Sequence, residues 1–184
     1  MDVTKTRNIN TFDKGIRIAK DKIKRLILDK LKKVAEDLIL DAEFAQGYNN
    51  LTGNTLTSYA VGIYYQYKLE EYIDIFEVDS GIDKPTSPKL TTGNGWVSVT
   101  HYDTGERVSV NRRTLDRTDE DYGFNTSREF LYDYTPDNGG FVIVMCTGTE
   151  YSAVLEHGGL NVLTDTFQFS PRAFLSNLRK IKYE

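Results

Sequence analysis

Side chains that commonly carry out catalysis are scarce in this chain of 184 residues. It contains two histidines, His101 and His157, and a single cysteine, Cys146. Cys146 ends the apolar run FVIVMC, where a small buried side chain is a more natural role than a nucleophile. Glu156 and His157 are adjacent and form the one candidate acid/base couple, but they precede a Gly-Gly pair that should end an element. We therefore expect no enzymatic activity.

Motifs for metals, cofactors and phosphates are also missing from the sequence. Two histidines cannot form a three-His zinc site, and there is no HExxH or HxH spacing. One cysteine excludes both a CxxC site and an internal disulfide. No GxGxxG or GxxxxGK[ST] loop occurs, and the acidic residues at 116–121 do not follow the calcium-loop pattern. We expect neither a metal nor a cofactor.

Charge is distributed unevenly along the chain. Residues 1–33 contain eight Lys and three Arg against four Asp, a formal charge of +7. The whole chain has a net charge of −4, so residues 34–184 have a net charge of −11. The basic segment is either the solvated face of a helix or a docking surface for an acidic partner or nucleic acid. If it docks, Lys20, Lys24 and Lys32 are candidate contact residues. The acidic remainder argues against a specific nucleic-acid reader, because it repels phosphate.

Aromatic residues are the most distinctive part of the composition, with 12 Tyr, 9 Phe and one Trp. Tyr64, Tyr65 and Tyr67 crowd one segment, which suits either an interface or a tyrosine-rich sheet packed on a helix. Consecutive residues of a strand face opposite sides, so Tyr64 and Tyr65 cannot both face the core. We include these three tyrosines, Trp96 and Phe174 among the candidate interface residues.

The elements that would position these residues begin with a long helix. Apolar residues recur at spacings of three and four over residues 12–46, which predicts an amphipathic helix of unusual length. Two shorter helices with a break near Asp29 and Lys30 are the alternative. A glycine- and asparagine-rich turn follows, then a strand through about Tyr67, with more strand or an irregular arm to Val78.

The rest of the chain is predicted to complete a single α+β domain over residues 1–184, with a mostly antiparallel sheet. Residues 79–140 would be an insertion, with a β-hairpin starting at Trp96 and a short helix near residues 127–134. The FVIVMC run predicts a strand buried on both faces, and a short helix or turn should follow it. A short C-terminal helix should begin at Ser170 as N-cap, with Pro171 as its first residue.

Membrane insertion and secretion are not expected. No stretch of 18 residues is free of charge, and the N-terminal residues lack the apolar core of a secretory signal. These features predict a protein that stays in the cytoplasm or joins an assembly there.

Three motifs, in order, resemble the head-tail joining proteins of tailed phages, the neck or tail-completion group. That family shows a long amphipathic helix, a TGxLxxS turn into a strand, a YAxxxExG segment and a closing PxxFL helix. This chain has TGNTLTS at 52–58, YSAVLEHG at 151–158 and SPRAFL at 170–175. It departs from the pattern by one inserted residue in each of the first two motifs, and residues 79–140 have no counterpart.

The resemblance implies a structural virion protein rather than an enzyme. Such a subunit forms a ring of six or twelve copies between portal and tail, contacts the adjacent connector ring and tail proteins, and surrounds the passing genomic DNA without binding it specifically. Residues 34–184, with their net charge of −11, would line a channel that repels DNA. The basic helix would dock on an acidic neighbouring ring. The protein would be assembled in the host cytoplasm and reside in the neck or tail region of the virion.

Three other functions remain open from the sequence. A nucleic-acid-binding module would use the basic helix with nearby tyrosines for stacking. An enzyme of unrecognised type would need a pocket around Glu156 and His157. A host-facing tail or adhesin domain would use the polar, tyrosine-rich surface.

Overall fold

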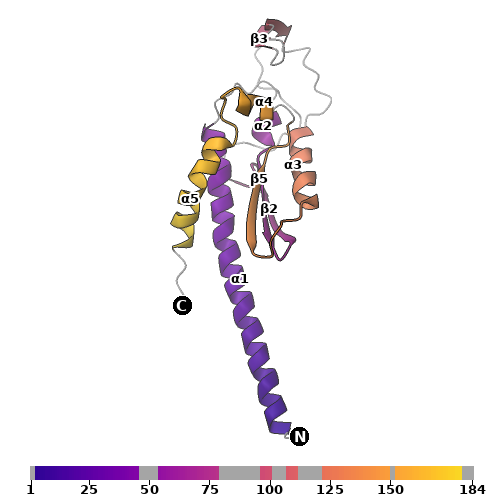
Figure 1. Ribbon diagram of the computed structural model, residues 1–184, viewed down its shortest axis with the longest axis vertical. Coiled ribbons are helices and arrows are strands. Elements are labelled where there is room, and N and C mark those ends of the chain that lie inside the picture. The colour runs from indigo at the N-terminus through magenta and orange to yellow at the C-terminus, as the bar shows by residue number, and fades with distance from the viewer. Residues whose placement is uncertain are drawn as a thin grey trace.

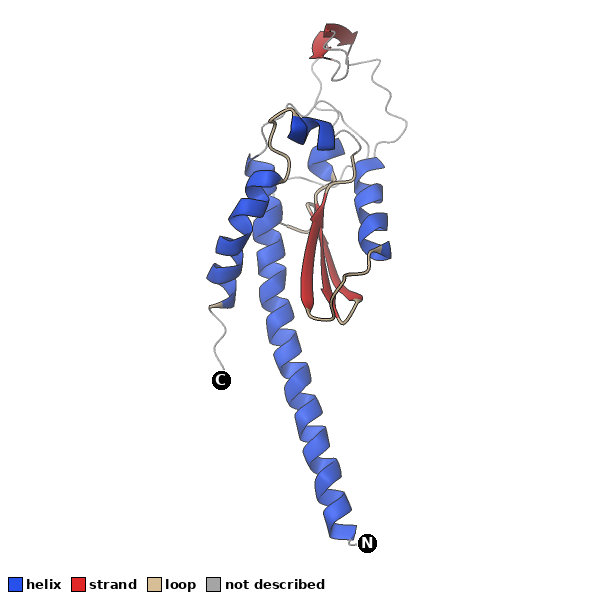
Figure 2. Ribbon diagram, viewed as in Figure 1, coloured by secondary structure: helices blue, strands red, loops and turns tan. Residues whose placement is uncertain are grey.

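A three-stranded antiparallel sheet lies between helices in the computed structural model (Figures 1 and 2), which describes residues 3–45, 54–78, 96–100, 107–111, 122–149 and 152–179. Its strand order is β2-β1-β5. The helices α1 and α5 cover one face, and α3 covers the other. This arrangement confirms the predicted α+β class with a long first helix, an antiparallel sheet and a short last helix.

The first helix, α1 (Val3–Ala45), is a single element of 43 residues. At 1.5 Å per residue it is about 65 Å long. It starts earlier than the predicted residue 12 because residues 3–11, although mostly polar, contain neither Pro nor Gly and can extend the helix. The alternative break at Asp29 and Lys30 is wrong, because the helix runs through both residues. A short helix, α2 (Asn54–Thr57), follows.

The strands β1 (Ala60–Tyr65) and β2 (Lys68–Asp74) form a hairpin. The predicted strand ends two residues early, because Gln66 and Tyr67 have φ values of 48° and 65° and make the turn. The register shifts between Ile63 and Tyr64, which leaves Glu70 as an extra residue on β2.

Alternate residues of β1 serve the two layers, as the sequence predicts. Val61 and Ile63 are fully buried and belong to the cluster that includes Leu31 and Ile39 of α1. Tyr64, also fully buried, donates a hydrogen bond to the carbonyl oxygen of Leu131 in α3 (Tyr122–Asp133) at 2.5 Å. The period of two in β1 therefore holds α1 and α3 on opposite faces of the sheet.

The region predicted as an insertion contributes to the body. The helix α3 starts at Tyr122 rather than near residue 127 and packs on β1, β2 and β5. A separate two-stranded sheet, β3 (Trp96–Thr100) with β4 (Arg107–Asn111), confirms the predicted hairpin strands. The predicted loop at 79–95 and the turn at 103–105 lie outside the described residues.

The strand β5 (Phe141–Cys146) confirms the FVIVMC prediction as a strand but corrects its burial. It is an edge strand of the three-stranded sheet, and each of its six residues is only partly buried. Full burial would require another strand on its outer side, and within the described residues none pairs there. The short helix expected after it is α4 (Ser152–His157).

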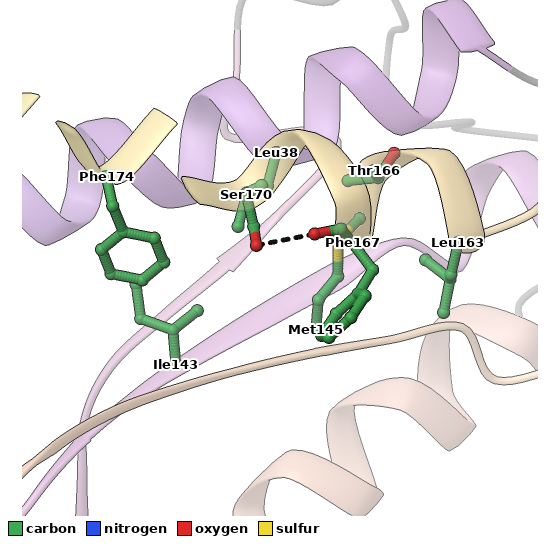
Figure 3. Close-up of a pocket in the computed structure, with 8 residues that line it drawn as sticks. All are labelled: Leu38, Ile143, Met145, Leu163, Thr166, Phe167, Ser170 and Phe174. Carbon is green, nitrogen blue, oxygen red and sulfur yellow. Dashed lines mark hydrogen bonds between the residues drawn. The ribbon is translucent and has the colours of Figure 1, made fainter. Parts of the chain in front are cut away.

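The last helix, α5 (Thr164–Leu178), begins six residues before the predicted N-cap. Ser170 and Pro171 are inside it, so the predicted start is wrong. Proline has no N–H to donate to the carbonyl four residues back, that of Phe167. The Ser170 hydroxyl donates to this carbonyl oxygen instead, at 2.8 Å (Figure 3). Ser170 thereby satisfies the acceptor that Pro171 leaves free, and the helix continues.

Candidate assembly surfaces

The N-terminal half of α1 extends beyond the body of the protein (Figure 1). Every residue from 11 to 23 is exposed, yet four apolar residues recur there at spacings of four, three and four. The exposed fractions include 69% for Phe12, 38% for Ile16 and 37% for Ile23. We call Phe12, Ile16, Ala19 and Ile23 the α1 stripe. A narrow stripe with this spacing is typical of a helix that packs against another helix.

Two of the three candidate docking lysines form ion pairs within the chain. Lys24 Nζ lies 2.6 Å from Glu70 Oε1 and 5.0 Å from the centre of the Tyr65 ring. Lys32 Nζ lies 3.0 Å from Glu71 Oε2, and this hydrogen bond raises the pKa of Lys32. Lys20 is exposed on the extended half of α1. Lys24 and Lys32 thus hold α1 against β2, and Lys20 alone lies clear of the body.

The β-bulge explains how two consecutive carboxylates reach the same helix. In a regular strand Glu70 and Glu71 would face opposite sides of the sheet. Because Glu70 is the extra residue of the bulge, both side chains reach lysines of α1.

The three candidate tyrosines have different environments. Tyr64 is in the core, where burial raises the pKa of its phenol to about 12. Tyr65 is half-buried and stacks on Phe141 of β5, with 4.5 Å between ring centres. Tyr67 is 55% exposed in the β1–β2 turn. Only Tyr67 presents most of its ring to solvent.

The other two candidates lie on different elements. Trp96 begins β3, and its side chain is outside the described residues. Phe174 of α5 is half-buried and packs against Ile143 and Met145 of β5 together with Leu38 of α1.

Hydroxyl groups join the segments that carry the first two family-like motifs. Ser58 and Thr147 share a hydrogen bond of 2.6 Å, and Thr147 shares one of 3.2 Å with Ser152 at the start of α4. Thr149 shares hydrogen bonds with Thr55, at 3.3 Å, and with Ser152. The described parts of these segments, 54–58 and 152–158, are therefore joined through Thr147 and Thr149 at one end of the sheet, although about a hundred residues separate them.

An apolar groove follows β5 on the side of α5 (Figure 3). It consists of a hollow of about 320 Å³ and an adjoining one of about 700 Å³, which share Met145, Leu163 and Phe167. Phe167 of α5 is 79% exposed, and Phe130 of α3 lines the wider hollow with 47% of its surface exposed. We call this the β5 groove. Sequence reasoning missed it because the predicted helix began at Ser170 and left Phe167 outside; in α5 the two phenylalanines lie seven residues apart, on one side of the helix.

The comparisons with known proteins are negative. No protein-family model, curated protein or solved structure matches this chain. Within the described residues, no three His, Cys, Asp or Glu side chains gather as metal ligands, and no helix is long and apolar enough to cross a membrane.

Glu156 and His157 serve different backbone groups rather than each other. The Glu156 carboxylate accepts hydrogen bonds from the N–H groups of Val162, Leu163 and Thr164, at 2.8–3.0 Å. It caps the N-terminus of α5, where the N-cap residue makes no side-chain cap of its own. The Nδ1 of His157 donates to the carbonyl oxygen of Ala153, at 2.6 Å. This geometry explains both residues by local structure.

Replacing Glu156 with glutamine should destabilise the protein at neutral pH by about 1 kcal/mol, as the loss of a helix cap does. Burial acts to raise the pKa of Glu156, but the hydrogen bonds from residues 162–164 together lower it. The charged cap should therefore contribute fully above pH 4.5, the ordinary value, and lose its contribution as the pH falls through the lowered pKa. Urea unfolding of both proteins should show a difference at neutral pH that shrinks in acid. A constant difference would contradict the capping role.

Cys146 should react slowly with alkylating reagents in the folded protein. Its side chain lines the β5 groove, and burial raises the pKa of the thiol from 9.0 to about 11. Because the thiolate is the reactive form, alkylation near neutral pH should be roughly 100-fold slower than in denaturant. Iodoacetamide labelling followed by mass spectrometry measures both rates, and equal rates would contradict the burial.

Proposed function

We propose that this chain is a structural subunit of a ring in the head-tail connector, or neck, of a tailed bacteriophage. The observation that carries the proposal is the convergence of the three family-like motif segments. Thr147 and Thr149 share hydrogen bonds both with Ser58 and Thr55 of the turn and with Ser152 of the second motif. Glu156 of the second motif caps α5, the helix that contains the third motif. Motifs so far apart in sequence join in one unit, as parts of a common fold should.

The extended half of α1 supports a role in assembly. A narrow apolar stripe that none of the described residues covers is unusual on a monomer and marks a contact surface. In the proposed ring of six or twelve copies this helix contacts a neighbouring copy or an adjacent portal or tail protein. The net charge of −11 on residues 34–184 suits a channel wall that lets DNA pass without binding it.

The proposal is tested by the mass of the purified protein in solution. Light scattering at low and high salt, with and without a short DNA duplex, should give a closed oligomer of six or twelve copies that ignores the duplex. Negative-stain microscopy of the same sample should show rings. A monomer that binds the duplex with steep salt dependence would contradict the proposal and support the nucleic-acid module instead.

A further inference from the structure

The α1 stripe continues a surface that the body already uses for helix packing. Eighteen residues make five full turns of an α-helix, so residues 18 apart lie on the same side. Ile16, Ala19 and Ile23 therefore line up with Val34, Asp37 and Asp41. Val34 packs in a cluster with Ala173 of α5, and Asp37 and Asp41 accept hydrogen bonds from Asn177 and Thr166 of α5. The stripe is thus the uncovered continuation of the face that binds α5.

A second helix packed on the stripe would lie against the N-terminal half of α1 in the way that α5 lies against its C-terminal half. Gly15 is consistent with such a contact. A Cβ placed there would have nothing within 4 Å, so packing against the described residues does not require a glycine at this position. Together with Thr11 and three residues of the stripe, Gly15 forms a shallow hollow on the helix surface. Glycine in an exposed helix costs about 1 kcal/mol relative to alanine. A close approach by another element at this point would offset that cost.

The β5 groove is an apolar surface, on the described body of the chain, that suits a helix. Its walls are α5, through Phe167 and Phe174, and α3, through Phe130, and its floor is the edge strand β5. Among the described residues that line it, Glu156 is the one charged side chain. Asp133, one turn from Phe130 on α3, is exposed.

Charge favours contact between the stripe of one copy and the groove of another. The stripe lies in the +7 segment, so two stripes placed side by side would repel each other. The segment that contains α3, β5, α4 and α5, residues 122–184, has seven Asp or Glu against five Lys or Arg, so the region around the groove is slightly negative and attracts a basic stripe. The two surfaces of one copy cannot meet, because the extended half of α1 leads away from the body (Figure 1).

We infer that the α1 stripe of one copy binds in the β5 groove of a second copy of this chain. This contact joins two different surfaces, so it leaves a free stripe at one end and a free groove at the other. Repetition of such a contact gives a closed ring or an open filament. The inference deepens the proposed function and rests on it for the closure of the ring. It also explains the edge of β5, which is apolar and unpaired within the described residues, whereas proteins usually protect such edges with charge or proline.

The test uses two full-length variants that each damage one surface. Ile16→Glu with Ile23→Glu removes the stripe, and Phe167→Glu places a charge in the groove. All three side chains are more than a third exposed, so both variants should fold. Ile18→Glu on α1 and Phe44→Glu are the matched controls, because both side chains are exposed and lie outside the two surfaces.

Light scattering should show that the wild type and both controls assemble, whereas each of the two variants is monomeric. An equimolar mixture of the two variants should regain association but stop at a dimer of twice the mass of one chain. In that dimer the intact stripe of the groove variant fills the intact groove of the stripe variant, and neither remaining surface can bind.

Three results would overturn the inference. A mixture that stays monomeric, with an assembling wild type, would mean that the stripe and the groove do not bind each other; the ring function would stand. Variants that assemble like the wild type would place the contact elsewhere. If the wild type is monomeric and sediments with phosphatidylserine-containing vesicles, and the stripe variant does not, the stripe binds a membrane surface instead.

One further result separates the contact from the ring. If the mixed variants form the expected dimer but the wild type forms only filaments, the contact is supported and the ring is contradicted.

Discussion

Alanine at position 148 should lower the free energy of unfolding by about 3 kcal/mol, because the backbone there leaves no room for a side chain. A Cβ on Gly148 would lie 2.1 Å from the carbonyl oxygen of Gly123 and 2.6 Å from the nitrogen of Ser127. Both are backbone atoms of α3, so the clash cannot be relieved by rotating a side chain. The first two turns of α3 would have to move away from the end of the sheet.

Urea unfolding followed by near-ultraviolet circular dichroism measures this effect, since the signal reports aromatic packing in the body. Gly140→Ala is the matched control, because its Cβ would meet nothing closer than the Asn138 side chain, at 3.3 Å. If Gly148→Ala unfolds at the same urea concentration as the wild type, α3 does not approach the segment 147–149 as described.

Substitution of Tyr64 should have an effect at least as large. Tyr64→Ala removes a fully buried ring, which costs about 3–5 kcal/mol. Tyr64→Phe keeps the ring but leaves the buried carbonyl oxygen of Leu131 without the phenol donor, at a cost of about 1–3 kcal/mol. Tyr67→Ala is the control, because that ring is 55% exposed. Urea unfolding should rank the three in this order, and equal values for Tyr64→Phe and wild type would contradict the hydrogen bond.

The same residue predicts a dependence on alkaline pH. Burial favours the neutral phenol and raises the pKa of Tyr64 from 10.0 to about 12. Its contribution to stability is therefore complete below pH 10 and is lost as the pH rises towards 12. Tyr64→Phe should not show this loss, so the difference between the two proteins should narrow in alkali.

Local patterns in the sequence predicted the elements well. The long helix, β1 and the hairpin strands from Trp96 follow from apolar spacing, since that spacing reports which side of an element is buried. The start of α5 was wrong because its cap comes from Glu156, eight residues before Thr164, and because Ser170 compensates for Pro171. Neither contact leaves a local signal.

Surfaces were harder to predict than elements because they depend on which neighbours are present. Lys24 and Lys32 resemble Lys20 in sequence, but the bulge at Glu70 brings β2 within reach of the first two. The FVIVMC run looked buried because a strand between two neighbours and one at an edge can have the same composition. The position of β5 at the edge follows from strand order, which the sequence does not encode locally.

Because α1 is unbroken, its extended half can bind a partner tightly. An isolated helix of some 20 residues is marginal in water, because its first turn is the expensive one to form. Here the docked turns from Lys24 onward already supply that nucleus, so the outer turns grow from it at little cost. A partner therefore meets a stiff rod instead of a coil that must order on contact. Little conformational entropy is lost on association, which favours tight binding through a narrow surface.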